Sequence, residues 1–170
     1  RWYLGIIAGS TLLIAWNILP EMGGMLRSLR FSFFQVASII TTTGFATADF
    51  NLWPELSRVL LLALMFLGAC AGSTGGGMKV SRLIIMLKSA KKEINRMLHP
   101  RSVHILKFEE KPLDDNTSRN VFIYFFILVA VVMASTMVVS LDNMDFDSTF
   151  SAVVACINNI GPGLGVVGPM

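Results

Sequence analysis

Apolar residues occur along this chain in long blocks separated by short polar or glycine-containing stretches, a pattern that predicts membrane-spanning helices. The first block, Trp2–Leu19, contains 18 residues and is long enough to cross a bilayer once at ~1.5 Å per residue. Val121–Leu141 predicts a second crossing. Leu56–Leu87 is also long enough, but five glycines fall between residues 68 and 77, and each costs up to ~1 kcal/mol in a helix. We therefore predict that this crossing is broken in its middle.

Two further apolar blocks, Leu29–Ile40 and Ser148–Ile157, are too short to span a bilayer and predict re-entrant half-helices. The first runs into residues 41–45, which we call the first break, and the second runs into residues 158–163, the second break. At membrane depth, carbonyls without helical partners are tolerated only where the backbone is buried in protein or lines a polar cavity. Carbonyls and hydroxyls arranged in this way replace the water around a dehydrated cation, so we predict an ion filter.

The two halves of the chain repeat. A crossing, an outer turn, a half-helix and a glycine-containing break occur twice, and Gly44 of Thr-Thr-Gly-Phe corresponds to Gly161 of Asn-Ile-Gly-Pro. Such repeats indicate that one unit cannot enclose a site alone, whereas a ring of units can. The alternative for Thr41–Gly44 is a small-residue contact between packed helices. The corresponding second break favours the filter.

Composition and charge agree with a membrane location. The 170 residues are 54% hydrophobic and 15% charged, whereas a soluble domain carries about 25% charge. Arg1 and residues 79–119 together contain eleven basic and five acidic residues, and the remainder contains three basic and six acidic ones. The positive-inside rule therefore predicts a cytoplasmic basic loop, with both half-helices entering from the outer face. Because the chain begins with Arg1, we expect it to be part of a longer protein.

The acidic turn before the second half-helix has two interpretations. Asp142, Asp145 and Asp147 lie near its entrance and would raise the local concentration of cations. Alternatively, Asp147 or Ser148 caps the N-terminus of the half-helix, which is the interpretation we favour.

The glycine-rich stretch at residues 68–77 has three interpretations. A phosphate loop needs a Gly-Lys pair, but Met78 separates Gly77 from Lys79. A hydrolase would use Ser73, but the histidines of the chain, His99 and His104, fall in the predicted cytoplasmic loop. We favour a flexible flap beneath the filter that blocks or opens the pore.

The basic stretch that ends at residues 99–101 is either a solvated face near anionic lipid headgroups or a docking surface for a cytosolic partner. The sequence favours neither.

These segments resemble the TrkH/KtrB family of bacterial potassium-uptake proteins. The resemblance rests on the two breaks, on Ala71–Lys79 and on Leu98–Arg101. It implies an all-α membrane fold in which repeats of transmembrane helix, re-entrant pore half-helix with filter loop, and transmembrane helix surround one pore. Residues 1–88 are then the third repeat with a broken second helix, residues 89–119 the cytoplasmic basic loop, and residues 120–170 the fourth repeat without its last helix.

The resemblance also implies the site residues. The filter for the potassium ion is expected at six positions, with two weaker candidates: Thr42, Thr43, Gly44, Asn159, Ile160 and Gly161, then Thr41 and Asn158. The intramembrane gating loop is expected to contain Gly68, Gly72, Ser73, Thr74, Gly75, Gly76, Gly77 and Lys79. Because the two breaks differ in sequence, we expect a modest preference for K⁺ over Na⁺.

Further implications of the resemblance are a multi-pass location in the bacterial inner membrane, contact with lipid, a homodimer, and a cytosolic nucleotide-binding regulatory subunit similar to TrkA. We expect no enzymatic activity and no binding of nucleic acid. Channel-like uptake and symport with H⁺ or Na⁺ both stay open. The alternative functions are another channel or transporter with half-helices, for water or ammonium, and, more distantly, an intramembrane hydrolase at Ser73.

Overall fold

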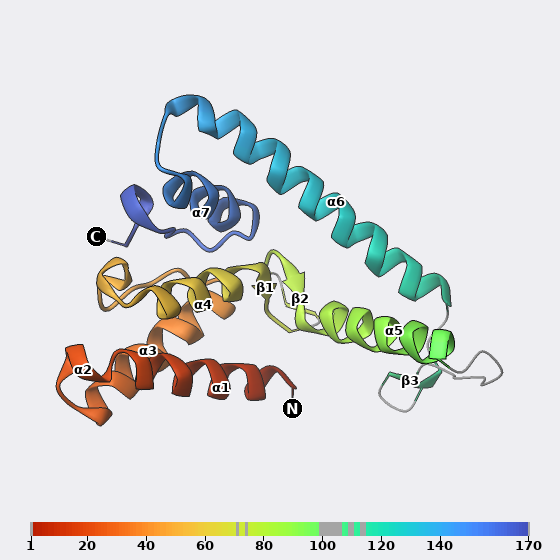
Figure 1. The fold of residues 1–170 in the computed structure, drawn as a ribbon, viewed down its shortest axis with the longest axis horizontal. Helices are drawn as coiled ribbons and strands as arrows, with labels where there is room; N and C mark the ends of the chain where they lie inside the picture. The colour runs from red at the N-terminus through yellow and green to blue at the C-terminus, as the bar shows by residue number, and fades with distance from the viewer. Residues whose placement is uncertain are drawn as a thin grey trace. The chain divides into compact units, whose positions relative to one another are not determined.

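The computed structural model is mostly helical and describes residues 2–70, 72, 73, 75–98, 107, 108, 111, 112 and 115–169 (Figure 1). It divides into two compact units. The first comprises residues 1–80 and 132–170, and the second comprises residues 81–131. Helix α6 (Asp115–Val139) contributes to both.

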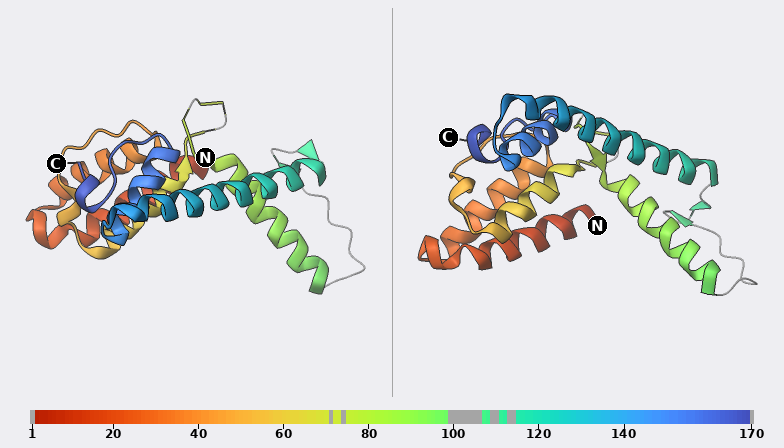
Figure 2. Two further views of the ribbon diagram at one scale, coloured as in Figure 1. Left: turned by 90° about the horizontal axis from the view of Figure 1, so that it is seen from above. Right: turned by 45° about the horizontal axis from the view of Figure 1, so that its top comes forward.

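The first unit begins with three helices, α1 (Trp2–Asn17), the short α2 (Leu19–Met22) and α3 (Met25–Ile40). Gly23 ends α2 in the left-handed region at φ 67°, which turns the chain so that α3 runs back along α1 (Figures 1 and 2). The α3 helix starts four residues before the predicted Leu29, and its first backbone bond runs from the Ser28 N–H to the Gly24 carbonyl at 3.0 Å.

The apolar block Leu56–Leu87, predicted to be a broken crossing, is interrupted as a helix. A 3₁₀ turn, η1 (Phe50–Leu52), leads into α4 (Glu55–Phe66), and the next helix, α5 (Val80–Leu98), starts 14 residues after α4 ends. Between them lies the glycine loop, defined here as residues 67–79. Its two ends pair as short parallel strands, β1 (Leu67–Gly68) and β2 (Met78–Lys79). The first and last residues of the loop therefore lie side by side.

The second half-helix completes the first unit. After α6, a 3₁₀ turn, η2 (Ser140–Asp142), leads into α7 (Phe146–Ile157), and η3 (Gly165–Val167) lies near the end of the chain. Fully buried side chains from α1, α3, η1, α4 and α7 form one core, which includes Ile14, Ile39, Phe50, Leu61 and Val154. The core holds the C-terminal ends of α3 and α7 within one packed unit.

Both ends of the predicted cytoplasmic loop are helical. Residues 89–98 continue α5, and residues 115–119 already belong to α6. The basic residues of this stretch favoured a loop in the prediction, although Ile85 and Ser89, which are four residues apart and both buried, follow a helical repeat. The hydroxyls of Ser89 and Ser118 hydrogen-bond at 2.6 Å, and the Arg82 guanidinium lies over the Tyr124 ring. Strands β3 (Lys107–Phe108) and β4 (Lys111–Pro112) form an antiparallel pair.

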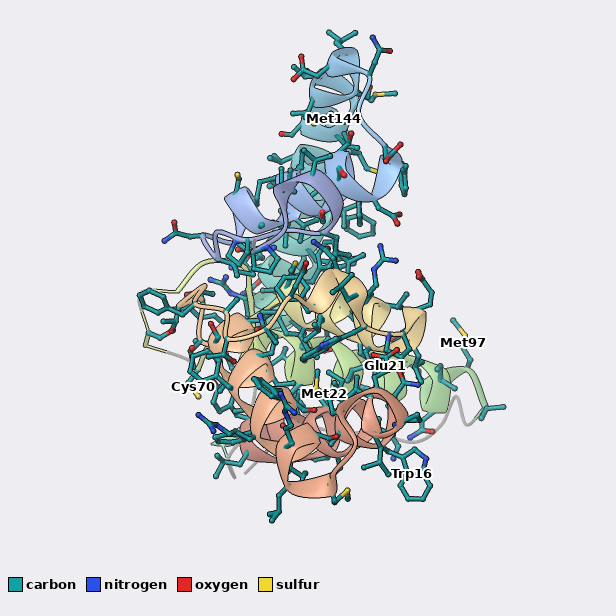
Figure 3. All side chains as sticks on the ribbon, turned by 90° about the vertical axis from the view of Figure 1, so that its left-hand side faces the viewer. Trp16, Glu21, Met22, Cys70, Met97 and Met144 are labelled. Carbon is teal, nitrogen blue, oxygen red and sulfur yellow. The ribbon has the colours of Figure 1, made fainter. Side chains whose placement is uncertain are left out.

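One stretch among the described helices, Asn116–Asp142, is long and apolar enough to cross a membrane, with a mean hydropathy of 2.6. The α1 and α7 helices are apolar but shorter. Large apolar side chains also project outward from the structure, for example Trp16 of α1, which is 76% exposed (Figure 3).

Candidate functional site

The first half-helix, α3, ends in a tight C-terminal turn. The Thr43 N–H donates to the Ser38 carbonyl at 2.9 Å, and the Thr42 N–H donates to the Ile39 carbonyl at 3.0 Å. These two bonds form a Schellman motif, in which two carbonyls of the last helical turn are satisfied and the chain turns away from the helix axis. Ser38 also donates its hydroxyl to the Phe45 carbonyl at 2.6 Å, which ties the end of the first break to the helix.

The second half-helix, α7, ends in the same way 117 residues later. The Ile160 N–H donates to the Ala155 carbonyl at 2.9 Å, and the Asn159 N–H donates to the Cys156 carbonyl at 3.1 Å. Each of these bonds has its counterpart at the end of α3. The two breaks, which differ in most of their side chains, therefore have the same local backbone geometry.

Backbone dihedral angles extend this correspondence. Thr42 and Asn159 lie in the left-handed region at φ 57° and 58°, and Gly44 and Gly161 have φ values of 77° and 111°. The left-handed region costs a residue other than glycine about 1–2 kcal/mol, and it is unusual for a β-branched residue such as threonine. Residues with a strained backbone are found preferentially at binding sites and in switch regions.

Carbonyl oxygens of both breaks are left without a partner. In the part of the chain that the structure describes, no donor hydrogen-bonds the carbonyls of Thr42, Thr43, Asn159 or Ile160. Because these groups lie at the C-terminal ends of two helices, the partial negative charge of each helix adds to that of the oxygens. The arrangement is suited to a cation.

The two breaks meet at Gly44. A Cβ atom on Gly44 would overlap the Ile160 carbonyl oxygen and would lie 3.2 Å from the Pro162 ring. Gly44 is therefore required both by its positive φ and by this close approach. Segments that are more than a hundred residues apart in the sequence are thereby brought together at the positions where the sequence predicted two filter walls.

The glycine loop contacts both breaks from another direction. A Cβ on Gly76 would lie 2.5 Å from the Asn158 carbonyl oxygen, and one on Gly77 would lie 2.7 Å from the Asn158 Oδ1 atom. A Cβ on Gly75 would lie 3.0 Å from the Thr42 hydroxyl oxygen. The glycines therefore allow the loop to pack directly against the ends of α3 and α7.

The side chain of Asn158 faces this loop. Asn158 is fully buried, and neither Oδ1 nor Nδ2 has a hydrogen-bond partner among the described residues. A buried carboxamide without partners is costly, so its orientation toward Gly77 identifies the boundary between the second break and the glycine loop as a functional candidate.

The glycine loop is tied internally by Lys79, whose Nζ donates to the Ser73 carbonyl at 2.9 Å. The Ser73 hydroxyl is buried and has no partner in the described part of the chain. Thr74, which the sequence also assigned to the loop, lies outside the described residues, as do both histidines. Within the described chain, Ser73 therefore has the Lys79 ammonium near its carbonyl but no base at its hydroxyl.

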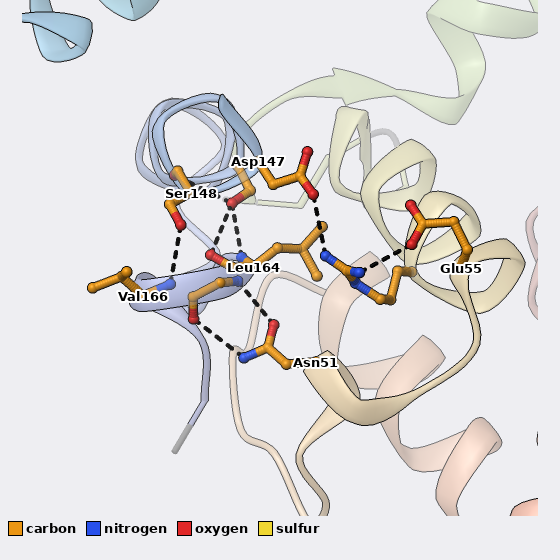
Figure 4. Close-up of polar contacts among 9 residues, drawn as sticks. Asn51, Glu55, Asp147, Ser148, Leu164 and Val166 are labelled. Carbon is orange, nitrogen blue, oxygen red and sulfur yellow. Dashed lines mark hydrogen bonds and ion pairs between the residues drawn. The ribbon is translucent and has the colours of Figure 1, made fainter. Parts of the chain in front are cut away.

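Polar side chains of η1, α4 and α7 form a network next to residues 164–166, which follow the second break (Figure 4). This network was not predicted from the sequence. Arg58 of α4 pairs with Asp147 of α7 at 3.2 Å and with Glu55 at 3.0 Å. The Ser148 hydroxyl accepts the Val166 N–H at 3.0 Å. The capping prediction is therefore wrong. Asp145 is the N-cap residue of α7, and no side chain caps the helix, because Asp147 and Ser148 are engaged elsewhere.

A second group of contacts in this network surrounds the segment after the second break. The Ser151 hydroxyl accepts the Leu164 N–H at 2.7 Å, and the Asn51 carboxamide binds the backbone of Gly165. The spacing of Ser148 and Ser151, three residues apart on an apolar half-helix, is the sequence signal that would have indicated one polar helix face. No comparable signal marks Asn51, whose partner is 114 positions away.

Comparison with known proteins agrees with this geometry. The family model for TrkH, described as a cation transport protein, matches residues 26–169. The chain belongs to the TrkH family. Among curated TrkH-family relatives, the Trk system potassium uptake protein TrkH of Salmonella typhimurium is 41% identical over 142 residues, which are 84% of this chain and 29% of that protein. TrkG of Escherichia coli K12 is 39% identical over 79% of this chain and 28% of that protein.

The fold matches as well. The crystal structure of the potassium transporter TrkH from Vibrio parahaemolyticus superimposes with a TM-score of 0.88 at 36% sequence identity, covering 97% of this chain and 36% of that one. The family resemblance drawn from the sequence is therefore confirmed, and so is a mostly helical membrane-transporter fold. The chain spans about 29% of the length of the curated TrkH relatives.

Proposed function

We propose that this chain supplies two walls of a potassium-selective filter in a larger uptake protein. The observation that carries the proposal is the meeting of two equivalent helix ends at Gly44 and Ile160, each with unpartnered carbonyl oxygens. The names of the relatives, Trk system potassium uptake proteins, support potassium as the transported ion.

In the proposed filter, the carbonyls of Thr42 and Thr43 in the first wall and of Asn159 and Ile160 in the second replace the water around K⁺. Gly44 and, in the second wall, Gly161 set the turn that aims these oxygens. Thr41 and Asn158 are secondary candidates. Thr41 uses its hydroxyl locally, as a donor to the Ala37 carbonyl at 2.6 Å, and its role is therefore to support the turn.

The glycine loop is the proposed gate. Its contacts with Thr42 and Asn158 place it against both walls, and its glycines leave few side-chain contacts to break when it withdraws. The buried carboxamide of Asn158 gains hydrogen-bond partners if the loop moves away and water or an ion enters. Lys79 fixes one end of the moving segment through the Ser73 carbonyl.

The larger assembly is also a proposal. Residues 1–88 and 120–170 correspond to the third repeat and most of the fourth, joined by a cytoplasmic connection at residues 89–119 that includes the end of α5. Outward apolar side chains such as Trp16 are suited to lipid or to the remaining repeats. The complete protein would be a multi-pass homodimer of the bacterial inner membrane that binds a cytosolic nucleotide-binding subunit similar to TrkA.

The test uses the full-length protein in a bacterial host that lacks its own potassium uptake. Growth at low K⁺ and uptake of Rb⁺ are expected, and both should be lost when Gly44 is replaced by alanine while the protein still reaches the membrane. A pore for water or ammonium would permit neither the growth nor the Rb⁺ uptake, so either failure in the wild type contradicts the proposal.

A further inference from the structure

Three consecutive backbone N–H groups beyond the second break are each held by a side chain (Figure 4). The three bonds run from Leu164 to the Ser151 hydroxyl at 2.7 Å, from Gly165 to Asn51 Oδ1 at 2.9 Å, and from Val166 to the Ser148 hydroxyl at 3.0 Å. The two outer acceptors belong to α7, the half-helix of the same repeat. The middle acceptor comes from the segment that follows the first break.

The contact made by Asn51 is two-sided. While its Oδ1 accepts the Gly165 N–H, its Nδ2 donates to the Gly165 carbonyl at 3.3 Å. The carboxamide thus binds both polar groups of one residue, as a neighbouring strand does in a sheet. A longer or shorter side chain cannot reproduce both bonds from the same position.

Asn51 is itself held in place. The Asp49 carboxylate accepts the Asn51 N–H at 3.0 Å, and the flanking side chains of Phe50 and Trp53 are 0% and 4% exposed. The 3₁₀ turn that carries Asn51 is therefore anchored in the core, and the carboxamide projects from a fixed point.

Gly168 encloses the carboxamide on its other side. A Cβ on Gly168 would overlap the Asn51 Nδ2 atom, although φ at Gly168 is −64°, which any residue adopts. The Gly168 N–H also donates to the Gly165 carbonyl at 3.0 Å. Alanine at position 168 would therefore displace the Asn51 side chain while keeping an ordinary φ, and its Cβ would lie 3.0 Å from the Gly165 carbonyl oxygen, so it disturbs the same contact from both partners.

We propose that Asn51 is a positioning residue that sets the spacing between the two filter walls by fixing Gly165. Gly165 lies only four residues after Gly161, and the adjacent Leu164 is tied to α7 by Ser151. The second wall and its helix are thus joined to Gly165, so the Asn51 contact with Gly165 fixes that wall relative to the segment that follows the first. The inference rests on the proposed function, because the distance between walls matters only if an ion binds between them.

The Arg58–Asp147 ion pair is a second polar contact between these repeats. The Asp147 side chain is 59% exposed, and exposed ion pairs contribute little. The Asn51 contact is also exposed to solvent, but its two hydrogen bonds hold both polar groups of Gly165, so it fixes the position of that residue more closely than the ion pair does.

The experiment compares Asn51→Ala, Asn51→Asp and Gly168→Ala in the full-length protein, with Val166→Ala as the matched control. Val166 is 78% exposed and contributes only its backbone N–H to the network, which alanine retains. Uptake of Rb⁺ and of Na⁺ is measured over a range of concentrations and normalised to the protein in the membrane. The three test variants should lower the preference for Rb⁺ over Na⁺ by about threefold to tenfold and raise the KM for Rb⁺, because hydrogen bonds of this kind contribute about 0.5–1.5 kcal/mol each.

The control should keep both values. If the variants keep the wild-type preference and KM and change only the amount of protein or the maximal rate, Asn51 is a structural residue and the inference is overturned. If Asn51→Ala does not reach the membrane, Asn51→Asp and Gly168→Ala decide the question by the same readout. A wild-type protein that takes up no Rb⁺ overturns the proposed function itself, which distinguishes that failure from a failure of the role of Asn51.

Discussion

Single residues decide whether the two breaks fit together. Gly44 and Gly161 occupy equivalent positions and both have positive φ, yet their surroundings differ. A Cβ on Gly44 meets the backbone of the other break, whereas a Cβ on Gly161 meets no atom within 4 Å in the described chain. The sequence indicated a turn at both glycines, because a glycine that follows an apolar helix favours a positive φ, and both glycines have one. It did not distinguish them, because the close approach depends on which segments meet.

Substitution of these two glycines by alanine should therefore have unequal effects. Gly44→Ala adds both backbone strain and a collision with the Ile160 carbonyl, and we expect it to abolish Rb⁺ uptake. Gly161→Ala adds the strain alone, about 1–2 kcal/mol, and should leave measurable uptake. Rb⁺ uptake per membrane-inserted protein is the measurement, and an equal loss in both variants would contradict the close approach.

Thr42 provides a second test at this scale. Because its φ is 57°, Thr42→Gly relieves about 1–2 kcal/mol of strain and should leave thermal stability in detergent unchanged or higher. The matched control is Thr43→Gly, since Thr43 has no positive φ and glycine there only adds flexibility, at a cost of about 0.5–1 kcal/mol. A lower melting temperature for the Thr42 variant than for the Thr43 variant would show that Thr42 is unstrained.

At the scale of elements, the sequence predicted helices that end at the two breaks and the interruption of Leu56–Leu87 at its glycines, because glycine content and apolar blocks are local properties. Element boundaries were less predictable. The α3 helix starts early at Met25, and α5 continues to Leu98 through residues whose charge indicated a loop. The polar contacts behind the second break were missed, since Asn51 and Gly165 meet only in the folded unit.

The glycine loop should limit flux if it is a gate. Shortening it across Gly72–Gly77 removes the segment that packs against Asn158 and Thr42, so we expect the rate of Rb⁺ uptake to rise severalfold while the preference for K⁺ persists. The measurement is initial uptake in cells with equal amounts of membrane-inserted protein. Unchanged flux in a correctly inserted protein would remove the gating role.

At the scale of the whole molecule, the two walls of the proposed filter are unequal. Their backbones agree at the ends of α3 and α7, but the groups that hold them differ. Ser38 anchors the Phe45 carbonyl at 2.6 Å in the first wall, whereas the equivalent helix position in the second wall is Ala155, which has no hydroxyl. The second wall is instead held farther along the chain, at Leu164 by Ser151 of α7 and at Gly165 by Asn51. We therefore expect the complete protein to transport measurable Na⁺ as well as K⁺. The carbonyls of walls that differ in sequence also differ in rigidity and orientation, and such a ring discriminates less sharply between the two ions.

The role of Ser38 makes this inequality testable. Ser38→Ala removes the hydroxyl that ties the Phe45 carbonyl to α3, so the end of the first wall loses this attachment to its own helix. The preference for K⁺ over Na⁺ should then fall about threefold to tenfold, in line with about 0.5–1.5 kcal/mol for one hydrogen bond. Ser32→Ala is the matched control, since Ser32 is equally buried in the same helix but donates only to the Ser28 carbonyl at 2.7 Å, one turn earlier. Competition between Rb⁺ and Na⁺ uptake in the full-length protein measures the preference. Strict exclusion of Na⁺ by the wild type, or equal effects of the two serine substitutions, would show that selectivity does not depend on how each wall is anchored to its own half-helix.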